Sequence, residues 1–96
     1  MPTGTVDVDF GAFPGSIEAK ATITGQTSLV AGSAIEAWLS PEQDTTDHTT
    51  YEQLIDGATI SVLVSDKIAG TGFTIYLRPT DGVRRYGKYH TSWVWA

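Results

Sequence analysis

Cysteine is absent from this 96-residue sequence, and histidine occurs only at His48 and His90. The missing thiols exclude disulfides, thiolate metal sites and a cysteine nucleophile, so side-chain packing must supply the stability. No apolar run approaches the roughly 18 residues that a membrane-spanning helix needs. Residues 1–4 do not begin a basic-then-apolar signal segment. We therefore expect a protein without a membrane partner and without a visible targeting segment.

Basic residues are also scarce: six Lys and Arg stand against eleven Asp and Glu, for a net charge of −5. This balance argues against nucleic acid as the main partner, because phosphate binding favours a basic surface. The charge is uneven along the chain. Residues 1–56 hold nine acids against one lysine, a balance of −8, whereas residues 57–96 hold two acids against five basic residues, a balance of +3. The acidic patch of one copy could dock on the basic patch of another. The alternative is a solvated surface with uneven charge.

Alternation of apolar and polar residues dominates the sequence, and this period of two is typical of half-buried strands. The alternating segments are residues 5–10, 16–24, 33–40, 59–64, 73–77 and 84–95. Turn residues separate them, and no long helical pattern is present. We predict an all-β fold in which residues 1–96 form a single antiparallel β-sandwich, immunoglobulin-like or jelly-roll-like, with six to eight strands.

Several local predictions follow from the turn residues. Phe13-Pro14-Gly15 favours a hairpin between the first two strands. Residues 84–95 are predicted to form a long last strand that is broken by a bulge at Gly87. Ser40-Pro41 favours one helical turn, and residues 51–55 fit either a helical turn or a short strand. The predicted core comprises Val8, Ile17, Ile23, Ile35, Val62, Phe73 and Ile75.

Candidates for catalysis or metal binding are few. The polar loop places Asp44, Asp47, His48 and Glu52 within nine residues, and such ligands suit several divalent ions. Their spacing matches neither a calcium loop nor a zinc signature, and no Gly-x-Ser-x-Gly motif is present. Gly70-Thr71-Gly72 precedes a strand rather than a helix, which favours a tight turn over a phosphate loop. We expect no enzyme, no cofactor and no metal; a metal-dependent hydrolase is the least favoured alternative.

The C-terminal segment combines basic and aromatic side chains, which are enriched in protein–protein interfaces. Its candidate interface residues are Arg84, Arg85, Lys88, Tyr89, Trp93 and Trp95. Strand alternation places Arg85, Tyr89, Trp93 and Trp95 on one face. The two tryptophans could equally close the core of a small sandwich.

The stretch 68–76 (IAGTGFTIY) and the ending that runs from Tyr86-Gly87-Lys88 to Trp93-Val94-Trp95 resemble a group of small proteins of tailed bacteriophages. Phe13-Pro14-Gly15, the segment 35–38 (IEAW), and Asp47-His48 followed by Glu52 are similar to the same group. The resemblance covers most of the chain. It implies a phage origin and a virion structural component, and it supplies no catalytic residues.

The resemblance thus leads us to expect a capsid decoration or cement protein, located in the virion and assembled in the host cytoplasm. Its partners would be the major capsid protein or another virion protein, together with further copies of itself in a homo-oligomer. A small tail, collar or fibre-associated protein is one alternative. A glycan-binding β-sandwich module, with Trp38, Tyr76, Trp93 or Trp95 stacking on the sugar, is another.

Overall fold

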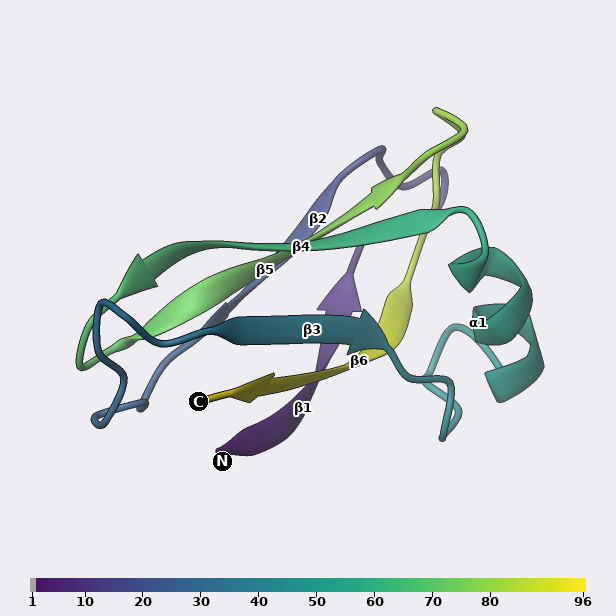
Figure 1. Ribbon diagram of the computed structural model, residues 1–96. Helices are drawn as coiled ribbons and strands as arrows, with labels where there is room; N and C mark the ends of the chain where they lie inside the picture. Colours follow the sequence, from purple (N-terminus) through teal and green to yellow (C-terminus); the bar gives the residue numbers. More distant parts are fainter. Residues whose placement is uncertain (1) are drawn as a thin grey trace.

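The computed structural model describes residues 2–96 and shows two packed three-stranded antiparallel sheets (Figure 1). Its elements are β1 (Thr3–Asp9), β2 (Ala19–Ile23), β3 (Ile35–Leu39), α1 (Thr50–Gly57), β4 (Ile60–Ile68), β5 (Gly72–Pro79) and β6 (Lys88–Trp95). One sheet has the order β1-β6-β3 and the other β2-β5-β4. The prediction of an all-β sandwich with six to eight strands is confirmed, and the strands number six among the described residues.

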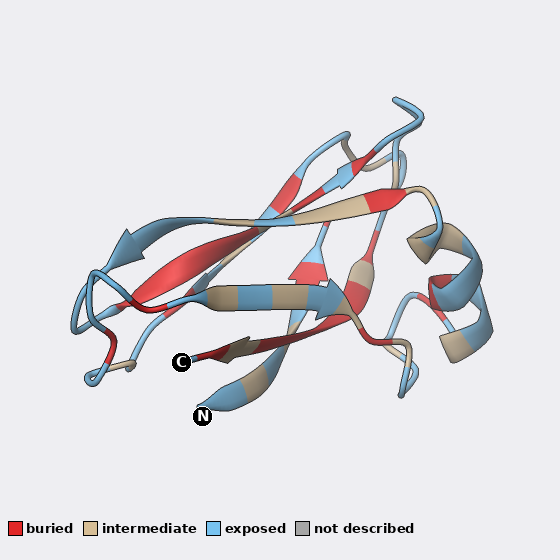
Figure 2. Cartoon of the chain, viewed as in Figure 1, coloured by how far each residue is buried: buried red, intermediate tan, exposed pale blue. Residues whose placement is uncertain are grey.

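The core lies between the two sheets, because each strand turns its apolar positions toward the opposite sheet. Its largest contributions come from the two central strands: Tyr89, Trp93 and Trp95 on β6, and Phe73, Ile75 and Leu77 on β5 (Figure 2). Of the predicted core residues, Val8, Ile23, Phe73 and Ile75 are buried, while Ile35 and Val62 pack at its margin.

Ile17 is the exception, since 44% of its surface is exposed. Strand β2 begins only at Ala19, so Ile17 lies in the connection that crosses from one sheet to the other. The predicted hairpin is wrong, because β1 pairs with β6 and β2 pairs with β5, in different sheets. The Phe13-Pro14-Gly15 turn instead lies against the segment before β6, where Ser16 bridges Arg85.

Most connections change sheet, which brings distant segments together. Among the described residues, only β4 and β5 are consecutive strands that pair with each other. Their turn contains Gly70-Thr71, so the prediction of a tight turn there is confirmed. Residues 84–95 do not form one long strand: β6 starts at Lys88, after Gly87 takes a φ of +74° that glycine tolerates well.

Helix α1 starts ten residues later than the predicted helical turn at Ser40-Pro41, which is absent. Thr49 caps the helix: its side chain accepts a hydrogen bond from the Glu52 N–H, and the Glu52 carboxylate accepts one from the Thr49 N–H. This reciprocal capping box satisfies two backbone donors at once. Residues 51–55 are thus helical. Among the described residues, no helix has the length and apolar character needed to cross a membrane.

Candidate functional site

Helix α1 is fixed to the sandwich through a buried glutamine. Gln53 is 1% exposed. Its amide Nε2 donates to the Gln43 carbonyl at 2.9 Å, and its Oε1 accepts from the His90 N–H at 2.7 Å. The amide therefore joins the helix to the preceding loop and to the central strand β6. Because a buried amide is stable only when its partners are in place, these bonds also set the rotation of α1 about its axis.

That rotation turns the apolar residues of the helix toward solvent. Tyr51, Leu54 and Ile55 occupy positions i, i+3 and i+4, so they share one face of α1. Their exposed fractions are 70%, 60% and 55%. A surface helix ordinarily buries its apolar face, whereas α1 buries Gln53 and exposes these three apolar residues. We call these three residues the α1 patch.

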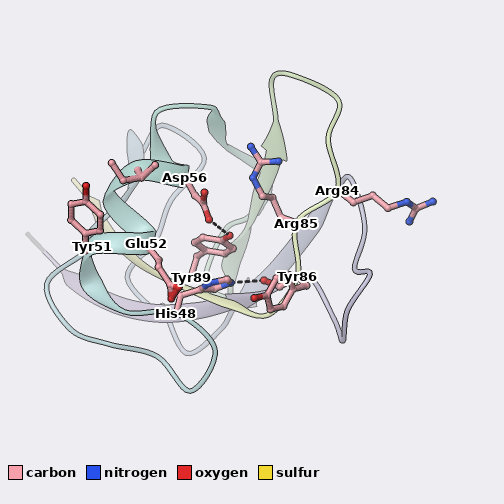
Figure 3. Close-up of a pocket in the computed structure, with 9 residues that line it drawn as sticks. His48, Tyr51, Glu52, Asp56, Arg84, Arg85, Tyr86 and Tyr89 are labelled. Carbon is pink, nitrogen blue, oxygen red and sulfur yellow. Dashed lines mark hydrogen bonds between the residues drawn. The ribbon is translucent and has the colours of Figure 1, made fainter.

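Beside the patch, a shallow groove of about 320 Å³ runs between α1 and the segment that leads into β6 (Figure 3). Tyr89 and His48 form its floor, with ring centroids 4.5 Å apart in a stacked arrangement. The Tyr89 hydroxyl donates to Asp56 Oδ2 at 2.7 Å, and the ring of His48 donates from Nε2 to the Tyr86 carbonyl at 2.6 Å. Burial, followed by the bond to Asp56, raises the pKa of Tyr89 and keeps it a neutral donor.

The far wall of the groove is aromatic. Tyr86 is partly exposed, and its ring meets the edge of the exposed Phe13 at a centroid distance of 5.5 Å. Arg84 extends away from the groove (Figure 3), and its guanidinium donates to the Gly15 carbonyl at 3.0 Å. Exposed apolar and aromatic side chains thus occur on both sides of the groove.

Arg85 stabilises the turn before β6. Its guanidinium donates to the Val83 carbonyl, the Thr59 hydroxyl and Asp81, and the ion pair with Asp81 is 3.1 Å long. The backbone N–H of Val83, and then Arg85, hold the pKa of Asp81 below its usual value. With its side chain only 12% exposed, Arg85 is a poor candidate for direct contact with a partner.

The predicted interface residues do not form one surface. Tyr89, Trp93 and Trp95 are buried in the core, and the Trp95 indole N–H donates to Gln26. Lys88 is half-buried on β6, so Arg84 alone among the six candidates is freely exposed. The reason is the position of β6: as the central strand, it packs one face against the opposite sheet and is flanked by β1 and β3.

The acidic loop has local structural roles. Asp44 accepts from the Thr50 N–H and Asp47 accepts from the Lys88 N–H, while Glu52 belongs to the capping box. His48 is buried in the groove floor. Within residues 2–96, no three His, Asp or Glu side chains are grouped so that they could hold a metal ion.

The acidic and basic halves of the sequence interleave in the fold. Strand β6, from the basic half, lies between β1 and β3, from the acidic half, and Lys88 is the register partner of Asp9. The four aromatic residues considered for glycan stacking do not share one surface. Trp93 and Trp95 are buried, while Trp38 and Tyr76 lie on the outer faces of opposite sheets.

The α1 patch was not among the residues singled out from the sequence. Its signal is Thr49-x-x-Glu52, a capping-box pattern that precedes Leu54-Ile55. Comparisons with protein-family models, curated proteins and solved structures found no match for this chain.

Proposed function

We propose that this protein is a structural component of a bacteriophage virion, a capsid decoration protein that docks on the major capsid protein through the α1 patch. The observation that carries the proposal is the outward apolar face of α1, with Leu54 and Ile55 more than half exposed. The resemblance of residues 68–76 and of the C-terminal ending to phage proteins supplies the biological setting.

The chemistry of the patch favours a protein partner. Leu54 and Ile55 offer no hydrogen bonds, which a sugar would require, but their burial against another protein is favourable at about 25 cal/mol per Å². The neighbouring Tyr51, Tyr86 and Phe13 add aromatic surface, which is enriched at the centres of interfaces. A short helix with an apolar i, i+3, i+4 face fits an apolar groove in a partner.

The role is non-enzymatic in this proposal. His48 is buried and donates to a backbone carbonyl, and the nearby carboxylates cap or brace the backbone. A small tail, collar or fibre-associated protein would use the same apolar patch against a different virion protein. The two locations are distinguished by which component retains the chain when particles are separated into heads and tails.

The first experiment is mass spectrometry of purified virions of the phage that encodes the chain, beside a lysate that lacks particles. We expect the chain at a fixed copy number per particle. In the second, recombinant protein is added back to particles that lack it. Leu54→Gln and Ile55→Gln keep good helix formers at exposed positions, and their combination should weaken particle binding by at least tenfold, about 1.4 kcal/mol.

The matched control is Val30→Gln, because Val30 is 59% exposed in the connection between β2 and β3, and this connection lies at the end of the sandwich opposite α1 (Figure 1). This variant should bind particles as the natural sequence does. Absence of the chain from purified virions would overturn the virion role. Unchanged binding by the α1 double variant would instead show that another surface makes the contact.

A further inference from the structure

The edge strand β4 differs from the other three edges of the sandwich. β1, β2, β3 and β4 each pair with one neighbour and leave one row of backbone N–H and C=O groups unpaired by a strand. β1 carries Asp7 and Asp9, β2 carries Lys20 and β3 carries Glu36. Residues 60–65 of β4 (ISVLVS) carry no charge.

Edge strands normally have features that prevent pairing with another chain, such as charges, proline or bulges. In β4 these features are confined to its end. The pairing with β5 is irregular between Ser65 and Ile68, Asp66 takes a φ of +56°, and the Lys67 ammonium donates to the Ala31 and Ser33 carbonyls. Residues 60–65 lie before this bulge and retain a regular register, with Leu63 58% exposed.

The space beside this edge is an open groove of about 440 Å³ between β3 and β4, with mixed lining. Glu36, Trp38 and Leu63 contribute to it, together with Ile35, Ala37, Val62 and Val64. The last four side chains belong to the margin of the core and are only partly buried. A strand added to β4 would therefore satisfy backbone groups and cover apolar side chains in the same contact.

We infer that β4 pairs antiparallel with β4 of a second copy, about a two-fold axis that passes within residues 61–65. The two sheets β2-β5-β4 would then join into one continuous six-stranded sheet across the dimer. An antiparallel pair of identical strands satisfies two-fold symmetry, because each residue meets its symmetry counterpart.

The absence of charge on residues 60–65 favours a second copy as the partner of β4, and it distinguishes β4 from the other three edge strands. A two-fold edge contact through β1, β2 or β3 places the charged residues of that strand and of its symmetry copy in the same strand pair, and each copy already has a net charge of −5. A contact through residues 60–65 brings no like charges into the strand pair, and the exposed Leu63 lies on its outer face. This inference does not depend on the α1 patch, because it concerns the free protein in solution.

The test uses analytical ultracentrifugation over a concentration series together with cysteine cross-linking. We expect a concentration-dependent dimer. Leu63→Lys should raise the dissociation constant of the dimer at least tenfold, and Ser65→Lys should raise it too. Both positions are exposed, so both variants should keep the fold, as circular dichroism would verify. Thr22→Lys, on an exposed residue of β2 that β5 separates from β4, should leave the dimer unchanged.

The cysteine-free chain provides a clean background for cross-linking. Single cysteine variants at each of residues 61–65 sample every two-fold register that the inference allows, since the residue on the axis meets its own counterpart and paired residues in antiparallel strands lie within disulfide range. Mild oxidation should cross-link at least one of these variants, while Thr22→Cys on the edge strand β2 should stay monomeric on denaturing gels. A monomer at every concentration would overturn the inference. A dimer that resists Leu63→Lys and cross-links at none of residues 61–65 would overturn it as well.

Discussion

Replacing Gln53 tests whether a single buried amide holds α1 in place. In Gln53→Met the side chain keeps its length, but the buried His90 N–H loses its acceptor and the Gln43 carbonyl loses its donor. A buried, unsatisfied donor costs about 1–3 kcal/mol, whereas water can replace the lost bond at the exposed Gln43. We therefore expect a loss of about 2 kcal/mol, which lowers Tm by roughly 8–16 °C in a domain of this size.

Thermal unfolding followed by circular dichroism measures the effect. Gln43→Met is the matched control: the substitution is the same, but residue 43 is exposed and acts only through its backbone carbonyl. It should change stability by less than about 0.5 kcal/mol. Gln53→Met and the control melting at the same temperature would refute the assignment of Gln53 as the anchor of the helix.

Two further predictions concern the core. Because burial and Asp56 raise the pKa of Tyr89, the folded state keeps the phenol neutral while the unfolded state ionises above about pH 10. Stability should fall as the pH rises past this value, and less steeply in Tyr89→Phe; parallel curves from urea titrations at high pH would contradict this. Gly72→Ala should destabilise by about 1–3 kcal/mol, since its Cβ would lie 1.8 Å from the Ile23 carbonyl oxygen. Gly32→Ala, where a Cβ meets nothing within 4 Å, serves as the control in the same urea titrations.

The sequence predicted the strands well because alternation is a local signal. Val8, Ile23, Phe73 and Ile75 lie at alternating positions, and all four are buried. Ile17 fits the same alternation but lies in a crossing between sheets. Periodicity identifies the apolar side of a segment and does not indicate where regular pairing begins.

Which strands pair with each other depends on contacts between distant parts of the chain. Phe13-Pro14-Gly15 favours reversal, and reversal alone is compatible with a hairpin or with a crossing to the other sheet. Pairing of β1 with β6 joins residues that are 79 to 91 positions apart, and no local pattern encodes that choice. The same pairing placed β6 at the centre of its sheet, so Trp93 and Trp95 became core residues rather than interface residues.

The orientation of helix α1 separates local sequence information from tertiary structure most clearly. The sequence by itself determined that the chain is all-β, that it lacks thiol chemistry, and that Thr49 and Glu52 can start a helix. Only the tertiary structure decided which side of that helix faces solvent. The bonds from Gln53 to His90 and Gln43 turn a polar residue inward and leave Leu54 and Ile55 exposed, against the usual tendency of an amphipathic helix. Hydrogen bonds between segments distant in sequence set this orientation, so local composition could not predict it.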